Sequence, residues 1–176
     1  MLDVDQSSAE CLIFTYKEGL LSPIAHDLLI RVTRFDVKID EEGRRVQARF
    51  DPSSLRVVSA LEGGSPADRL SDADKRKIEQ NIVDEVLDAR AYPEILFTST
   101  SVTPEDSGFH VEGSLTLHGQ TRVISLKSRP EGDRQVAEVA IHQPDYGIKP
   151  YSAMLGTLKV KPDLTVRIAL PNVKTP

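Results

Sequence analysis

The sequence has a single cysteine, Cys11, and this scarcity excludes two kinds of structural staple. An intramolecular disulfide needs two cysteines, and a cysteine-rich zinc site needs several. No helix N-terminus or basic cluster adjoins Cys11, so we expect it to be a small buried hydrophobic side chain and not a reactive thiol. A chain of 176 residues can bury enough surface to be stable without staples, and we expect one domain over residues 1–176.

Long apolar runs and an excess of positive charge are also missing. No run approaches the ~18 apolar residues of a membrane-spanning helix, so we expect no stable membrane insertion. The N-terminus lacks the basic and apolar regions of a secretory signal, which predicts a cytoplasmic protein, or a periplasmic one if a leader has been removed. The formal net charge of −5, without a basic stripe, argues against binding to nucleic acid.

Apolar and polar residues alternate with a period of two along much of the chain, which indicates strands with one buried face. Within residues 28–39 the apolar positions change parity between Val32 and Phe35, which predicts a bulge or bend near Thr33. We count eight strand candidates and one helical interruption, too little helix for repeated βαβ units. The pattern therefore predicts an all-β fold, an antiparallel barrel of eight strands.

One helix is predicted at about residues 71–89, in the middle of the chain. Ser71 is a good N-cap, and Asp72 and Asp74 lie in the first turn, where the helix dipole favours negative charge. Apolar residues at helical spacing form one stripe, namely Ile78, Ile82, Val83, Val86 and Leu87. The rest of the helix is charged, which is typical of a helix lying across one wall or one end of a sheet.

Residues 145–156 form the least regular segment of the sequence. They are rich in amphipathic side chains, with two tyrosines, a methionine and a leucine. Long irregular segments in compact domains are often lids or binding loops. A plug that covers the open end of a barrel explains the same pattern, and the two interpretations are compatible.

Sequence signatures of catalysis are absent. There is no Gly-x-Ser-x-Gly elbow, no His-Glu-x-x-His, no glycine-rich phosphate loop and no dinucleotide fingerprint. One catalytic alternative would bring His26, Asp27 and His142 together at the barrel mouth, as a metal site or as an acid–base pair for a small substrate. Metal-ligand spacing within one element is missing, which favours simple hydrogen bonding of His26 and Asp27 to the backbone.

The interior of an eight-stranded barrel is just wide enough to be filled by side chains or to hold one slender ligand. The chain has no tryptophan and only five phenylalanines to fill it. Small residues also occupy candidate inner positions, for example Ala48, Gly113 and Ala140. This composition favours a cavity. The alternative is a filled barrel that acts as an interaction scaffold, which predicts no continuous cavity.

Two motifs resemble those of the YceI-like family. Tyr92–Thr100 resembles its "yPeI-F-ST" strand, and Gly113–Arg122 resembles its "G-LT-hG-T" hairpin. The spacing from the charged helix to the first motif agrees as well, and so does Asp145–Ile148 after the penultimate long strand. The resemblance extends from about Cys11 to Leu170, nearly the whole chain.

This resemblance implies an eight-stranded, lipocalin-like antiparallel barrel with a helix inserted midway. Its interior is then a tunnel for a polyisoprenoid or a related amphiphilic lipid, such as a polyprenyl quinone, with no other cofactor. Members of the family are often homodimers that are exported to the bacterial periplasm. The leading hypothesis is therefore a soluble, non-enzymatic protein that binds, carries or senses a long apolar molecule.

Strand parity gives the candidate ligand-binding residues, because burial of apolar area, at roughly 25 cal/mol per Å², would drive binding. The candidates for the tunnel wall are Phe14, Tyr16, Ile30, Val32, Phe50, Phe97, Leu115, Leu117 and Ile141. Polar and amphipathic groups at the mouth would orient a headgroup. The candidates for the mouth or lid are Tyr146, Tyr151 and Met154. No catalytic or metal-binding residue is expected.

Overall fold

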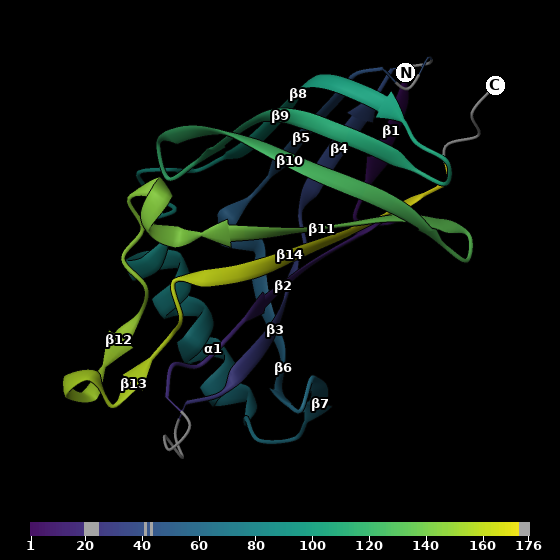
Figure 1. Cartoon of the computed structure of the whole chain (residues 1–176). Helices are drawn as coiled ribbons and strands as arrows, with labels where there is room; N and C mark the ends of the chain where they lie inside the picture. The colour runs from purple at the N-terminus through teal and green to yellow at the C-terminus, as the bar shows by residue number, and fades with distance from the viewer. Residues whose placement is uncertain (20–24, 41, 43, 173–176) are drawn as a thin grey trace.

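A computed structural model describes residues 1–19, 25–40, 42 and 44–172 of the chain. Strands dominate it, and one long sheet curls around an interior with a single α-helix at one end (Figure 1). Every described strand pair is antiparallel. Within the described ranges, no helix has the length and apolar character needed to cross a membrane. The predicted all-β, antiparallel class is confirmed.

The main sheet has twelve strands in the order β1-β4-β5-β8-β9-β10-β11-β14-β2-β3-β6-β7. A separate two-stranded sheet pairs β12 with β13. The strands of the main sheet are β1 (Leu2–Asp5), β2 (Glu10–Thr15), β3 (Asp27–Val32), β4 (Phe35–Ile39), β5 (Val46–Phe50), β6 (Leu55–Glu62), β7 (Ser65–Ala67), β8 (Ile95–Pro104), β9 (Phe109–Leu117), β10 (Gln120–Glu131), β11 (Arg134–His142) and β14 (Asp163–Pro171). Those of the small sheet are β12 (Ser152–Ala153) and β13 (Leu158–Lys159).

The predicted number of eight strands is wrong, because bends divide three long runs of the chain into β1 with β2, β3 with β4, and β5 with β6, and the short strand β7 adds an edge beside β6. The expected bend near Thr33 is confirmed, and it lies beside the short 3₁₀ helix η1 (Pro52–Ser54) that separates β5 from β6. The Thr33 amide donates to the carbonyl of Ser54, and the Asp51 amide donates to the carbonyl of Arg34. The two runs therefore change direction together and stay hydrogen-bonded through the corner.

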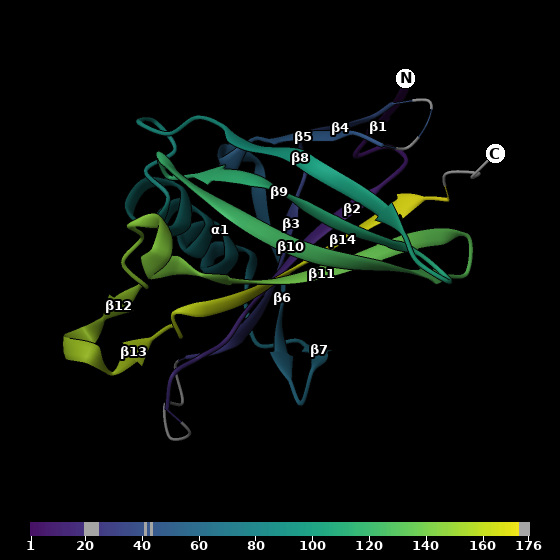
Figure 2. The ribbon, with the colours of Figure 1, turned by 45° about the horizontal axis from the view of Figure 1, so that its top comes forward.

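These bends let the sheet curl, with β8, β9 and β10 on one side and β11, β14, β2 and β3 on the other (Figure 2). The long strand β10 connects the two sides, since it pairs with β9 as far as Lys127 and with β11 from Ser128 onward. Gly108 lies against this crossing point, where an added Cβ would be 2.0 Å from the carbonyl oxygen of Ser128. The resulting shape is the barrel-like, lipocalin-like architecture that was expected.

The predicted helix is present as α1 (Asp72–Asn81), which continues into the π-helical stretch η2 (Ile82–Val86). Its N-terminus is a capping box, in which the Asp74 amide donates to Ser71 Oγ and the Ser71 amide donates to the Asp74 carboxylate. Glu79 joins the helix to the sheet by accepting a hydrogen bond from the Val57 amide at 2.8 Å. The helix thus lies against β6 at one end of the curled sheet (Figure 1).

A corner of the barrel is held where three distant loops meet. The ring of His118 lies 4.3 Å from that of Tyr92, and His118 Nδ1 is 3.2 Å from the carbonyl oxygen of Tyr146. His118 and Gly119 both have positive φ, as expected for the tight turn between β9 and β10. An added Cβ on Gly119 would lie 2.7 Å from the Tyr92 ring. Glycine is therefore required at position 119, both because the backbone is left-handed and because the Tyr92 ring leaves no room for a Cβ.

We expect Gly119→Ala to lower the free energy of unfolding by about 2–4 kcal/mol, because a left-handed backbone and a steric clash both penalise the methyl group. Gly132→Ala is the matched control, since Gly132 has φ of +62° in the β10–β11 turn and nothing within 4 Å of an added Cβ. It should lose only about 1 kcal/mol. Chemical denaturation measures both. Equal losses would show that contact with Tyr92 has no part in fixing this corner.

Candidate ligand-binding cavity

A cavity of about 750 Å³ lies inside the curled sheet. That volume is within the range of roughly 300–1,000 Å³ typical of ligand pockets. Both sides of the sheet and α1 contribute to its wall, and most of the lining side chains are apolar. The structure contradicts the filled-barrel alternative, which predicted no continuous cavity.

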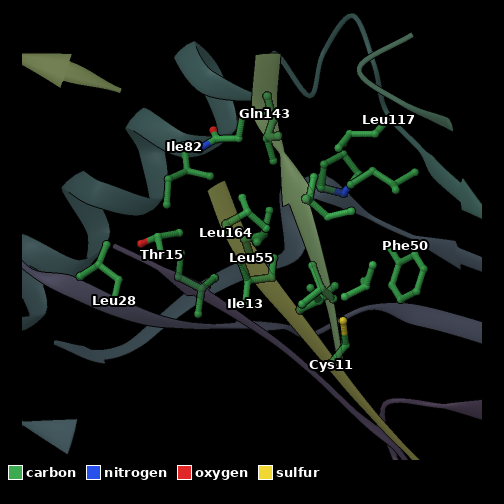
Figure 3. A pocket seen from close by; sticks show the side chains of 18 of the residues that line it. Cys11, Ile13, Thr15, Leu28, Phe50, Leu55, Ile82, Leu117, Gln143 and Leu164 are labelled. Atoms are coloured by element: carbon green, nitrogen blue, oxygen red, sulfur yellow. The ribbon is translucent and has the colours of Figure 1, made fainter. Parts of the chain in front are cut away.

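Strand alternation determines which side chains face the cavity. On β2 these are Cys11, Ile13 and Thr15, and on β14 they are Leu164, Val166, Ile168 and Leu170. Figure 3 shows Ile13 and Leu164 pointing into the same space as Leu55 and the helical Ile82. Many of these interior side chains remain half-exposed. Apolar groups that face empty space lack contact partners on that side, and a bound apolar molecule would supply them.

Seven of the nine predicted wall residues line the cavity. They come from strands on both sides of the sheet, and they are Ile30, Val32, Phe50, Phe97, Leu115, Leu117 and Ile141. Of the three small residues predicted at inner positions, only one lines the cavity. Ala48 lines the cavity, the Phe97 ring occupies the space beside Gly113, and Ala140 is exposed on the outer face of β11.

Phe14 and Tyr16 were predicted on the tunnel wall, and the structure places both away from it. The cavity side of β2 carries Cys11, Ile13 and Thr15, so residues of the other parity face outward. Tyr16 Oη is 2.9 Å from Thr165 Oγ1 of the neighbouring β14. The prediction failed because Leu12, Ile13 and Phe14 put apolar side chains on both faces of β2. Alternation alone then does not show which face of the strand points into the barrel.

Two of the three mouth candidates, Tyr151 and Met154, line the cavity. Tyr146 does not, and that assignment is corrected. Its side chain is only 3% exposed, and its carbonyl meets His118 at the barrel corner. Burial raises the pKa of the Tyr146 hydroxyl, with a smaller contribution from the charge of Asp145. Tyr146 therefore anchors the start of the irregular segment, while Tyr151 and Met154 reach the cavity.

The helix contributes lining residues that were not among the predicted site residues. Leu70, just before its N-terminus, and Ile78, Ile82, Val86 and Leu87 along it all face the cavity. None of the residues of α1 and η2 is fully buried, because their apolar stripe borders empty space instead of packed side chains. The stripe itself was visible in the sequence. What the sequence did not reveal was that the stripe completes a binding wall.

Polar groups lie at the two ends of the cavity. Asn81 of α1 donates a hydrogen bond from Nδ2 to Tyr151 Oη at 3.0 Å, which ties the helix to the irregular segment. The lining contributed by α1 and the segments around it also includes the basic and acidic side chains of His26, Arg69, Asp74, Lys77 and Lys159. At the β10–β11 end, Ser128 Oγ accepts from the Phe109 amide and donates to Gln135 Oε1. The helix end is thus the more charged of the two.

The residues of the catalytic alternative do not converge. His26 lines the cavity, whereas the Asp27 carboxylate accepts a hydrogen bond from the Lys17 amide. His142 Nδ1 lies 2.6 Å from Asp163 Oδ1, on a strand separated from β3 by β14 and β2. Over the described ranges, no three His, Cys, Asp or Glu side chains are grouped so that they could hold a metal ion. The proposed His26–Asp27–His142 site is therefore wrong.

Comparison with known proteins supports the same architecture. The family model of the YceI-like domain matches residues 2–171. BcnA of Burkholderia cenocepacia superposes with a TM-score of 0.67 at 15% identity, covering 97% of this chain and 99% of that one. A polyisoprenoid-binding domain from Saccharophagus degradans, implicated in plant cell wall breakdown, gives a TM-score of 0.58 at 15% identity over 92% of this chain and 91% of that one.

A YceI protein from Campylobacter jejuni has a TM-score of 0.54 at 14% identity and covers 90% of this chain and 91% of that one. Comparison with curated proteins gave no match. Identities this low establish a shared fold and leave the ligand of this chain to be judged from its own cavity.

Cys11 offers a chemical probe of the cavity wall. Its side chain is 2% exposed, as expected for a small buried hydrophobic residue. Burial, with a smaller contribution from the charge of Glu10, raises the pKa of the thiol to about 12. Because only the thiolate is nucleophilic, a thiol with so high a pKa is unreactive near neutral pH.

We expect Cys11 in the folded protein to react with iodoacetamide at pH 8 at least about a hundredfold more slowly than in the protein unfolded by guanidinium. The unfolded chain restores an ordinary thiol pKa and full access. Mass spectrometry of the alkylated protein follows both rates. Comparable rates would contradict the buried, protonated state of Cys11 in the cavity wall.

Proposed function

The chain belongs to the YceI-like family, and from that premise we propose that it binds, carries or senses one long apolar or amphiphilic molecule inside its barrel. A polyisoprenoid or a polyprenyl quinone is the ligand that fits this proposal. The role is non-catalytic binding. The observation that carries the proposal is the apolar cavity of about 750 Å³, enclosed by strands of both sides of the sheet and by the stripe of α1.

Burial of apolar surface supplies the driving force. A tail that loses about 300 Å² of apolar surface to the cavity gains on the order of 7 kcal/mol at roughly 25 cal/mol per Å². Immobilising a flexible tail offsets part of that gain. Side chains such as Val166 and Ile168, half-exposed in the empty cavity, would recover close contacts when the ligand enters. An elongated, flexible hydrocarbon suits an interior lined on all sides by aliphatic groups.

The polar groups at the helix end support one orientation of the ligand. His26 and Lys77 line the cavity on this side, and so does Arg69, which is paired with Glu62, while the Asn81–Tyr151 contact lies at the C-terminal end of α1. A polar headgroup placed among them keeps access to hydrogen-bond donors and to solvent, whereas the β10–β11 end offers mainly the paired Ser128 and Gln135. We therefore assign the headgroup to the helix end and the tail to the interior beyond it.

Native mass spectrometry tests the proposal directly. Protein freed of lipid and then incubated with a polyprenyl quinone should carry one lipid molecule per chain, because the proposal places the lipid in the one apolar cavity of about 750 Å³. The double variant Val139→Phe/Val166→Phe should take up at least about tenfold less lipid. The two residues are cross-strand neighbours on β11 and β14, and both line the cavity. The stability of the variant should not fall, because the new rings extend into empty space.

Ala140→Phe is the control for added bulk, since Ala140 lies on the outer face of β11 next to Val139. This variant should bind lipid as the wild-type protein does. A wild-type protein that stays empty after incubation with polyprenyl lipids would count against the function itself. Full uptake by the double variant would place the ligand elsewhere.

Tyr151→Phe should speed ligand exchange. The substitution removes the hydrogen bond from Asn81 that ties the irregular segment to α1, a contact worth about 1 kcal/mol. We expect the dissociation rate of a bound lipid to rise by up to about fivefold with little change in the secondary structure. Transfer of a fluorescent polyprenyl probe to acceptor vesicles measures this rate. An unchanged rate would indicate that the ligand leaves by another route.

A further inference from the structure

The β12–β13 hairpin projects from the barrel on the side of α1 (Figures 1 and 2). Its tip is the short turn η4 (Met154–Gly156). Leu155 at this tip is 108% exposed and Met154 is 66% exposed, so two large apolar side chains stand next to each other in solvent. Single exposed apolar residues are ordinary, but an adjacent pair on a projecting tip marks a contact surface.

The backbone holds this pair outward in an unfavourable conformation. Met154 has φ of +53° and Leu155 has φ of +56°, a left-handed region that residues with a Cβ rarely occupy. Such strain gathers at functional sites, where the surrounding structure enforces it. The small β12–β13 sheet supplies that enforcement here, through the pairing of Ser152 with Lys159 and of Ala153 with Leu158.

The segment that carries the tip has a net charge opposite in sign to that of the whole chain. Residues 146–162 contain Lys149, Lys159 and Lys161 and neither aspartate nor glutamate, although the chain carries a net charge of −5. All three lysines are exposed. In the part of the chain that the structure describes, none of them has a carboxylate within salt-bridge distance. Their positive charge is therefore available to an outside partner.

The same hairpin borders the cavity. Ala153, Met154, Leu158 and Lys159 all contribute to its lining, so Met154 faces both the cavity and the solvent. Whatever binds the tip is therefore placed directly at the charged end of the cavity. A second protein chain is a poor occupant, because a specific interface buries about 800 Å² on each partner and a two-residue tip offers far less.

We propose that this tip docks the protein on an anionic lipid bilayer. Met154 and Leu155 enter the interface between headgroups and acyl chains, and the three lysines meet the negative headgroups. Docking in this way holds the cavity mouth against the membrane, which gives a ligand a path between bilayer and cavity that avoids water. The transfer step rests on the proposed function. The docking itself does not.

Vesicle co-sedimentation of the full chain, freed of lipid, tests the docking. The wild-type protein should sediment with phosphatidylcholine–phosphatidylglycerol vesicles and much less with pure phosphatidylcholine. Met154→Asn/Leu155→Asn should lower the partition coefficient by about tenfold or more, because it removes the inserted apolar groups. Asparagine is chosen because it tolerates a left-handed backbone. Lys149→Gln/Lys159→Gln/Lys161→Gln should lower it by about fivefold for each lysine removed.

Matched controls exclude a general loss of apolar area or charge. Leu2→Thr removes a residue that is 40% exposed on β1, at the opposite end of the molecule in both views, and should leave sedimentation unchanged. Lys38→Gln removes an exposed lysine from β4 and should lower binding much less than any single substitution at the tip. Thermal unfolding checks that each variant remains folded.

The outcomes separate docking from ligand binding. A protein that takes up a polyprenyl quinone from detergent solution but ignores anionic vesicles would overturn the docking and leave the proposed function standing. Vesicle binding without any uptake would support the docking and count against the function. Tip variants that sediment like the wild type would overturn the docking. The docking would also be overturned if the wild-type protein were a dimer and the tip variants were monomers, as measured by sedimentation velocity without vesicles. The partner of the tip would then be a second copy of the chain.

Discussion

Ser54 holds together two long strand runs at the point where both change direction. Its carbonyl accepts hydrogen bonds from the amide and the hydroxyl of Thr33, and its Oγ accepts from the Arg34 amide and donates to the carbonyl of Asp51. The residue is 1% exposed, so these bonds satisfy polar groups that water does not reach. Because the corner stays hydrogen-bonded, the sheet can turn sharply without exposing backbone, and the curl that encloses the cavity depends on it.

An enclosed, poorly filled interior follows from that curl. The strands on the two sides cannot approach closely enough to pack against each other, so their inner residues border a shared space. The helix closes one end with an apolar stripe that is likewise only half-buried. A bound apolar molecule would therefore act as part of the core and would stabilise the folded state in proportion to its occupancy. The irregular segment at the same end adds the Tyr151 contact and the exposed tip, so the proposed sites of ligand exchange and of docking lie at one end of the barrel.

The two family motifs in the sequence, Tyr92–Thr100 and Gly113–Arg122, fix the fold more than they form the cavity wall. His118, Gly119 and Tyr92 meet at a corner outside the cavity, where ring packing and a left-handed turn fix three loops relative to one another. The apolar positions between these corners, such as Phe97 and Leu115, do line the cavity. Motifs of this kind therefore identify the architecture, and the chemistry of the ligand depends on the other lining residues.

The sequence by itself determined the local elements: the bend at Thr33, the helix capped at Ser71 and the tight turn at Gly119 all follow from side-chain pattern and backbone preference. Only the tertiary structure decided which face of β2 is inside, because Leu12 and Phe14 are as apolar as Ile13. It also decided that the helix stripe borders a cavity, that bends divide three of the eight predicted strands, and that β7 adds a twelfth strand to the main sheet. An alternation with a period of two defines the two faces of a strand. Which face is the inner one depends on how the sheet curls, and the curl depends on pairing with strands far away in the sequence.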